Sequence, residues 1–287
     1  MRKNFTPWLL IIGAFVILLF NDVFPTLYAF YLSLHVYNLV TNPQPIFTYL
    51  NNYVNLLRHD LDINTSFIRG FAFSILTTII SLFLGLVVAF FMAKDFKGKN
   101  IFRIIMCLPL AIPPITVGSM WKLMCNPNVG VIPYFLKFLG ITYDISSNGL
   151  HAFITVLIMD LWHWTPLVGL VLLASLASIP KQIIESAEVD GASWPQKLRY
   201  IYFPLMALDI LFVAMIRFMD SLKIFDEIWM LTGGGPGTST RLVSIALYSM
   251  VLKRWDMGYG AAVSMVFTYV IIFVSWILYK ILQVRRA

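Results

Sequence analysis

Long apolar runs dominate the hydrophobic pattern of this chain. Six runs of about 20 residues or more stand out, at residues 8–33, 67–93, 101–124, 150–177, 205–228 and 258–281. A helix of about 20 apolar residues crosses a hydrocarbon layer of roughly 30 Å. The ten-residue alternation of a membrane-spanning strand is missing, and backbone polar groups in lipid must be bonded internally. The pattern therefore predicts an all-α polytopic membrane protein with six transmembrane helices.

Polar or helix-breaking residues interrupt two of these runs. The first contains a polar stretch at 21–25, and we expect an uncleaved first span because no small-residue cleavage site follows it. Pro109, Pro113 and Pro114 lie in the third run, where proline removes a backbone donor and bends or breaks a helix. We expect a bend there, serving either as a packing kink or as a gating hinge.

The polar segments between the runs suggest how the chain is divided. We expect residues 1–66 to hold the first transmembrane helix and an external segment, and residues 67–287 to form a core of five helices. The segments 38–64 and 126–148 are polar and contain Pro and Gly, which is typical of partly structured external loops.

Composition and charge agree with a membrane protein. The chain is 59% hydrophobic and 12% charged, whereas a soluble domain is about a quarter charged. The net charge of +7 comes from short clusters of Lys and Arg between apolar runs and forms no basic face, so we expect no nucleic-acid partner. Twelve of these residues lie on the side of the termini and eight on the other, with Arg217 inside a run. The positive-inside rule then predicts cytoplasmic termini and a location in the inner membrane.

The cysteines and histidines show no metal-binding or catalytic pattern. Cys107 and Cys125 lie in or beside an apolar run, where small buried hydrophobic residues are expected. The four histidines, which are His35, His59, His151 and His163, lack the spacing of metal ligands. We expect no metal site, no disulfide framework and no enzyme active site.

One polar segment between the fourth and fifth runs has the character of a docking element. Residues 180–206 read PKQIIESAEVDGASWPQKLRYIYFPLM and are too polar to enter lipid. Apolar positions recur at roughly helical spacing, and Gly191 and Pro195 interrupt them, which predicts two short helices joined by a turn. The segment lies on the cytoplasmic side of the predicted topology, where it can meet another protein.

This segment resembles the EAA loop of ATP-binding-cassette importer permeases. That motif reads E-A-A, three residues, G, nine residues, and then I-x-L-P. The chain has the residues Glu-Ser-Ala at 185–187, Gly191, and Ile-Tyr-Phe-Pro at 201–204, with every spacing kept. The departures are Ser186 for Ala and Phe203 for Leu, both small in consequence.

Two further segments resemble the sugar-type members of that family. Phe-Asp at 225–226, the run LTGGGP at 231–236 and Thr240 match an F-D-x4-L-T-x-G-G-P segment, and DLWHWTPL at 160–167 is similar to the fourth helix. The resemblance extends from about residue 93 to the C-terminus. It implies the permease fold of type I importers and import of a sugar or sugar-like solute.

The resemblance also implies partners and a coupling role for the loop. The partners are a second homologous permease, two ATPase subunits that bind ATP-Mg, an external solute-binding protein and the lipid bilayer, with no cofactor in this chain. The residues implied to contact the ATPase are Glu185, Ala187, Glu188, Asp190, Gly191, Ile201 and Pro204. Glu185 and Asp190 are the first candidates for charged contacts or helix caps. The alternative is that these residues only fold the loop on itself.

Ionisable residues within apolar runs mark a candidate translocation path, because charges in lipid are costly. Two helical faces carry them: Asp160, His163, Trp164 and Leu167 in the fourth run, and Arg217, Asp220, Ser221 and Ile224 in the fifth. We expect Trp164 to stack on a sugar ring while polar residues of the fifth run bond its hydroxyl groups. The alternative is an ion pair of Arg217 with Asp160 or Asp220 that only holds helices together.

Two other classes of protein stay in view. A secondary transporter would need further spans or inverted repeats and would not need the cytoplasmic loop. A membrane-embedded enzyme would need a catalytic cluster at one interface. The glycine-rich segment 233–237 is followed by no Gly-Lys-Ser or Gly-Lys-Thr, so it is an external turn under a docked binding protein or a plain connector. The sequence leaves open a disaccharide, oligosaccharide, polyol, glycoside or glycerol phosphate as solute.

Overall fold

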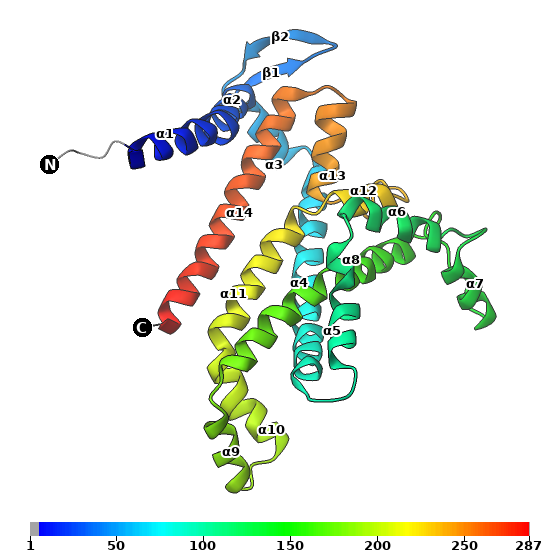
Figure 1. Cartoon of the computed structure of the whole chain (residues 1–287). Helices are drawn as coiled ribbons and strands as arrows, with labels where there is room; N and C mark the ends of the chain where they lie inside the picture. The colour runs from blue at the N-terminus through cyan, green and yellow to red at the C-terminus, as the bar shows by residue number, and fades with distance from the viewer. Residues whose placement is uncertain (1–5, 287) are drawn as a thin grey trace, which may run out of the picture. The chain divides into compact units, whose positions relative to one another are not determined.

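The computed structural model describes residues 6–286 and separates into two compact units (Figure 1). Unit 1 consists of Met1–Thr65 and Ala246–Val270, and unit 2 consists of Ser66–Ile245 and Ile271–Ala287. The sequence-based division into residues 1–66 and 67–287 stays a prediction. Unit 1 also contains a segment from near the C-terminus.

Unit 1 begins with one continuous apolar helix. It consists of α1 (Thr6–Leu18), the π-helical turn η1 (Leu19–Val23) and α2 (Phe24–Ser33). The polar residues do not break this helix, because their side chains bond to its own backbone. Asn21 donates to the carbonyl oxygen of Ile17 at 3.1 Å, and Thr26 donates to that of Asp22 at 2.6 Å. The interruption expected at 21–25 is therefore a widened turn.

The rest of unit 1 is a short hairpin with helices around it. Strands β1 (His35–Asn38) and β2 (Asn42–Phe47) pair antiparallel and lead to α3 (Asn51–Arg58), followed by the start of α4. The π-helical turn η4 (Ser249–Lys253) and the first part of α14 (Met257–Arg286) complete the unit. Asn38 donates to the carbonyl oxygen of Arg254 at 3.0 Å, which ties the hairpin to this later segment. The sequence analysis did not foresee the hairpin.

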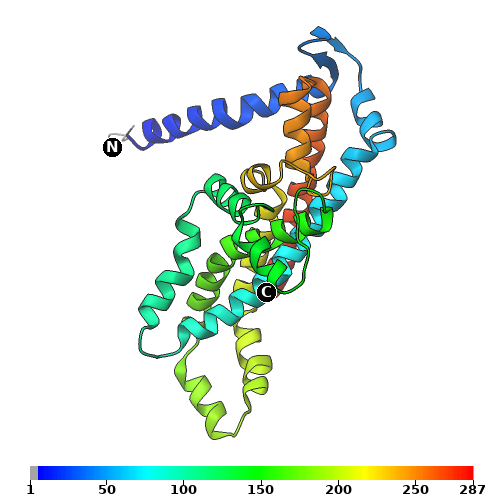
Figure 2. The same ribbon diagram turned by 90° about the vertical axis from the view of Figure 1, so that its right-hand side faces the viewer.

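Unit 2 contains the long helices that carry the functional residues (Figures 1 and 2). Its elements are α4 (Leu61–Ala93), which starts in unit 1, α5 (Lys99–Cys107), η2 (Leu108–Ala111), α6 (Pro114–Met124), α7 (Val131–Phe138), α8 (Gly149–Ser178), α9 (Lys181–Val189), α10 (Trp194–Lys197), η3 (Leu198–Tyr202), α11 (Phe203–Leu222), α12 (Asp226–Leu231) and the first residues of α13 (Val243–Tyr248).

Two apolar clusters form the core of unit 2. One joins the first half of α8 to α6 and α12 around Met159 and Ile228. The other joins the second half of α8 to α4 and α11 around Leu172 and Met206. Helices α4 and α8 approach closely at Gly85, where an added Cβ would lie 2.6 Å from the Val168 side chain. Small residues at such crossings let transmembrane helices pack through their backbones.

The third apolar run is sharply bent, as its prolines predict. The helices Lys99–Ala111 and Pro114–Met124 meet at an angle of 99° across a short break. Ile112 and Pro113 at this break are extended, with ψ angles of 127° and 139°. Within residues 6–286, five helices are long and apolar enough to span a membrane, or six if the bent pair counts as one span.

The fifth predicted span is displaced toward the N-terminus. Its helix runs over Trp194–Leu222, whereas the sequence analysis placed the span at 205–228. The helix ends at Leu222, and in the link that follows the carbonyl oxygen of Ile224 accepts a hydrogen bond from Ser244 at 2.5 Å. Asp226 and Glu227 then begin α12, where acidic residues are favourable near a helix N-terminus.

Candidate functional site

The segment between α8 and α11 forms the two short helices and the turn that the sequence predicts. Helices α9 and α10 project from one end of unit 2 (Figures 1 and 2). Gly191 has a φ angle of +75°, a left-handed conformation that suits glycine. Ser193 and Gln196 form a capping box at the start of α10. The side-chain cap of α10 thus comes from Ser193, a residue that the sequence analysis did not single out.

This loop is anchored on one side and exposed on the other. Ile184 and Tyr202 pack against the second apolar cluster, and the Phe90 ring of α4 lies 5.8 Å from Trp194 and 5.2 Å from Tyr202 between centroids. Val189 is 88% exposed at the opposite side. Apolar contacts therefore fix the loop to the helices while one face is left for a partner.

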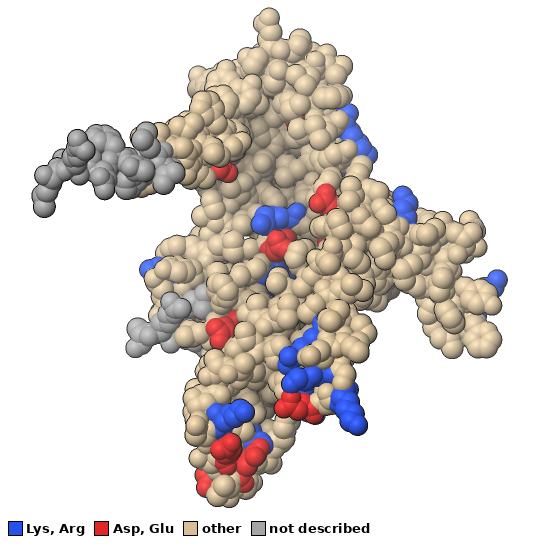
Figure 3. Space-filling view, viewed as in Figure 1, with Lys and Arg blue, Asp and Glu red and all other residues tan. Residues whose placement is uncertain are grey.

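The charged residues of the loop are mostly free of internal contacts. Glu188 accepts a hydrogen bond from Lys197 at 2.7 Å. Glu185 and Asp190 are exposed, and within residues 6–286 their carboxylates form no hydrogen bond or ion pair. Figure 3 shows acidic and basic side chains gathered at this end of unit 2. Such exposed, unpaired carboxylates are available to a protein that docks there.

The remaining predicted contact residues lie along the same segment. Ala187 is half-buried in α9, Ile201 is half-buried in η3, and Pro204 is exposed in the first turn of α11. Six of the seven thus belong to α9, its turn and η3, and Pro204 lies in the first turn of the long helix α11.

A buried ion pair joins α8 to α11 in the apolar core. Arg217 donates to Asp160, and the two residues are 2% and 0% exposed. The ion pair that the sequence allowed with either Asp160 or Asp220 therefore forms with Asp160. A second polar contact joins the same helices nearer the loop, where Ser175 donates to Asp209 at 2.5 Å.

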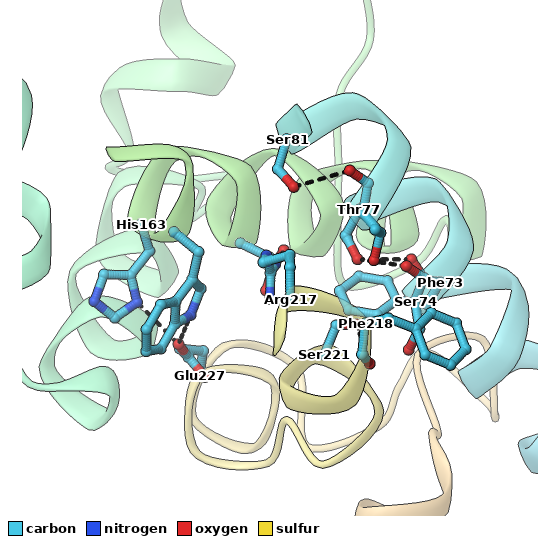
Figure 4. A network of polar contacts seen from close by, with 12 residues as sticks. Phe73, Ser74, Thr77, Ser81, His163, Arg217, Phe218, Ser221 and Glu227 are labelled. Carbon is cyan, nitrogen blue, oxygen red and sulfur yellow. Dashed lines mark hydrogen bonds and ion pairs between the residues drawn. The ribbon is translucent and has the colours of Figure 1, made fainter. Parts of the chain in front are cut away.

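A second buried cluster links three elements (Figure 4). His163 Nδ1 lies 2.9 Å from Glu227 Oε1, and His163 Nε2 lies 3.2 Å from the carbonyl oxygen of Ile112 at the break in the bent pair. Trp164 Nε1 donates to the same Glu227 oxygen at 3.2 Å. The Arg217 guanidinium lies 5.9 Å from the Trp164 ring centroid, so the two clusters are in contact.

These groups surround a polar cavity of about 210 Å³. Its lining consists of four carboxylates (Asp160, Asp220, Asp226, Glu227), two cations (Arg217, Lys223), and Trp164, Pro114, Ile224 and Phe225. Five of the eight predicted path residues therefore meet at one cavity. Within residues 6–286, no three His, Cys, Asp or Glu side chains converge as a metal site requires.

The other three predicted path residues do not line this cavity. His163 lies behind it and supports Glu227, and Leu167 is half-buried elsewhere on α8. Ser221 donates to the carbonyl oxygen of Phe218 in its own helix at 2.9 Å. Ile224 lines the cavity from the link after α11, and not from the helical face on which the sequence analysis placed it.

Five lining residues lie outside the predicted path, and Glu227 is the most buried of them; the other four are Pro114, Lys223, Phe225 and Asp226. Glu227 falls one residue before the end of the predicted fifth run, and no role was predicted for it. The available signal was an acidic residue within an apolar segment, where ionisable groups are costly unless they have a function or a partner.

Comparison of the sequence with known proteins identifies a transporter family. Residues 81–287 match the family model described as binding-protein-dependent transport system inner membrane component. The chain is 31% identical to the trehalose/maltose transport system permease protein MalF of Thermococcus litoralis, over 99% of this chain and 96% of the relative. It is 29% identical to the trehalose transport system permease protein SugA of Mycobacterium tuberculosis, over 98% and 90% of the two chains.

A solved structure shares the fold. The crystal structure of a bacterial alginate ABC transporter in complex with its alginate pentasaccharide-bound periplasmic protein matches with a TM-score of 0.84, over 96% of this chain and 93% of that chain, at 17% identity. This likeness concerns the fold alone. The family match and the relatives settle the class: the chain belongs to the family of binding-protein-dependent transport system inner membrane components, the membrane-spanning permeases of ATP-driven importers.

Proposed function

We propose that this chain is one of two permease subunits of an importer for a neutral, hydroxyl-rich solute such as a disaccharide or oligosaccharide. Its partners are a second homologous permease, two ATPase subunits that bind ATP-Mg, and an external solute-binding protein. The chain itself carries no cofactor or enzyme active site, and both termini lie in the cytoplasm. The carbohydrate class is supported by two relatives that are named as permeases for trehalose or for trehalose and maltose.

The pairing of charges in the cavity is the main observation that supports a neutral solute. Arg217 is paired with Asp160, and Lys223 Nζ lies 4.0 Å from Asp220 Oδ1. Both lining cations thus have a carboxylate beside them, whereas an anionic solute would need a cation of its own. Trp164 offers an aromatic surface beside these polar groups, a combination that suits a sugar ring and its hydroxyl groups.

The position of the coupling loop supports ATP-driven movement of this cavity. The loop joins α8 and α11, which contribute Asp160, Trp164, Arg217 and Asp220 to the lining. In this proposal the exposed residues of the loop bind a groove of the ATPase. Closure of the two ATPases then moves both helices and opens the cavity to alternate sides of the membrane.

Uptake by the complete complex in proteoliposomes tests this function. With its partner subunits, the binding protein and ATP, the complex should import labelled trehalose or maltose and should not import glycerol 3-phosphate. Replacing Trp164 by Ala should lower sugar uptake roughly tenfold, equivalent to about 1.4 kcal/mol of lost contact. The matched control is Trp162→Ala, because Trp162 lies two residues away and faces a different, apolar depression.

Two results would contradict the proposal. Import of glycerol 3-phosphate in preference to both sugars would exclude a neutral solute. An equal loss of uptake in the Trp164→Ala and Trp162→Ala variants, at equal amounts of assembled complex, would show that Trp164 has no specific contact with the sugar ring.

A further inference from the structure

The backbone at Glu227 is held in place by close packing. Helix α12 lies against α6 so tightly that a Cβ added to Gly118 would be 2.5 Å from the carbonyl oxygen of Glu227 and 3.0 Å from its Cα. Glu227 itself is 3% exposed. The position of its carboxylate is therefore set by the fold, as a group that recognises a ligand requires.

The two oxygens of this carboxylate have different surroundings. Oε1 lies 2.9 Å from His163 Nδ1 and accepts from Trp164 Nε1 at 3.2 Å. Oε2 has no hydrogen-bond partner among residues 6–286, although the Glu227 side chain lines the cavity. Because Glu227 lines the cavity, this oxygen is available to a donor group of a ligand or water there.

The hydrogen-bond pattern fixes what Oε2 can do. The carbonyl oxygen of Ile112 can only accept, so His163 Nε2 carries a hydrogen. The contact between His163 Nδ1 and Glu227 Oε1 must also contain a hydrogen, carried by one of these two atoms. In both cases Oε1 is engaged in this contact, so Oε2, as a carboxylate or carbonyl oxygen, is the oxygen left to accept a hydrogen bond from a ligand.

We infer that Glu227 is a specificity-determining residue that contacts the solute: Oε2 accepts a hydrogen bond from one hydroxyl group of a neutral sugar in the cavity. This inference rests on the proposed function and adds a requirement to it. The hydroxyl group must donate, so an oxygen or fluorine that only accepts cannot replace it.

A set of singly deoxyfluorinated trehalose or maltose analogues tests this requirement, because fluorine keeps approximately the size of a hydroxyl group and removes its hydrogen. Uptake is measured with the complete complex at saturating binding protein. One analogue should be imported about tenfold more slowly than the parent sugar, as expected for a hydrogen bond to a charged group. In the Glu227→Gln variant, whose amide nitrogen takes the place of Oε2, this penalty should disappear. Comparing each sugar with itself in the two proteins cancels the selectivity of the binding protein.

Asp209→Asn is the matched control, since Asp209 is another acid of the membrane-spanning helices and does not line the cavity. It should keep the penalty of the wild type. The inference is overturned if the Glu227→Gln variant still imports that analogue about tenfold more slowly than the parent sugar. It is also overturned if the Asp209→Asn variant loses this difference as fully as Glu227→Gln does.

If the Glu227→Gln variant fails to assemble, uptake of the fluorinated analogues by the wild-type complex still tests the inference. The inference is overturned if every analogue that still binds the binding protein is imported as fast as the parent sugar. The proposed function stands in that case. Absence of uptake of both parent sugars overturns the two together.

Discussion

The coupling loop and the polar cavity use charged residues in opposite ways. In the loop, Glu185 and Asp190 are exposed and unpaired within the described residues 6–286. In the cavity, Asp160 and Arg217 are almost fully buried and bonded to each other. Exposed charges contribute little to folding and are free to bind a partner, whereas buried charges are stable only while they remain paired. The difference indicates that substitutions in the loop should alter coupling, and that those in the cavity should also alter assembly.

The largest effect is expected from breaking the buried pair. Arg217→Leu leaves Asp160 as an uncompensated buried charge, which typically costs about 3–5 kcal/mol. We expect a large loss of assembled complex, measured as the fraction recovered by size-exclusion chromatography together with its thermal midpoint.

The double variant Arg217→Leu with Asp160→Leu provides the control. It removes both charges and should regain most of the lost stability, while uptake stays low because the cavity has lost two of its polar lining groups. If Arg217→Leu alone were as stable as the wild type, the buried pair would contribute as little to stability as the exposed charges of the loop.

A smaller effect, mainly on coupling, is expected at the turn of the loop. Gly191 has a φ angle of +75°, and an added Cβ would meet no atom within 4 Å. Val at this position therefore has space, but its backbone conformation is unfavourable by roughly 1–2 kcal/mol. Gly191→Val should lower binding-protein-stimulated ATP hydrolysis and uptake several-fold, while the thermal midpoint falls by only a few degrees.

Asn is the matched replacement because it tolerates the left-handed conformation better than other residues. Gly191→Asn should retain nearly normal coupling. Equal behaviour of the Val and Asn variants would mean that the conformation of this turn does not matter for coupling.

The same contrast explains how much could be predicted from the sequence. The loop is one continuous segment, so the helical spacing of its apolar positions and the interruptions at Gly191 and Pro195 were sufficient to predict its helices and its turn. The bend of the third span followed from its prolines for the same local reason.

The cavity is assembled from three separate parts of the sequence, which are α6, α8 and the stretch from the end of α11 into α12. Helical periodicity placed Asp160 and Trp164 on one face of a helix, yet it could not show that Ser221 bonds to its own helix. It also could not locate Glu227, because the long helix ends at Leu222 and Glu227 belongs to the separate short helix α12. The hairpin in unit 1 was missed because its second strand contains two prolines, which are unfavourable in strands.

The smallest effect is expected from the ion pair between Glu188 and Lys197 in the loop. The Glu188 side chain is 57% exposed, and exposed pairs contribute between zero and about 1 kcal/mol. Glu188→Gln and Lys197→Met should each shift the thermal midpoint by no more than about 2–4 °C, and the double variant should shift it no further, since both remove the same contact. High salt should reduce even this shift, because screening weakens an exposed pair and leaves a buried one almost unchanged. A shift as large as that of Arg217→Leu would mean that the loop depends on its charges for folding, and Glu185 and Asp190 would then lose their distinction as residues kept free for a partner.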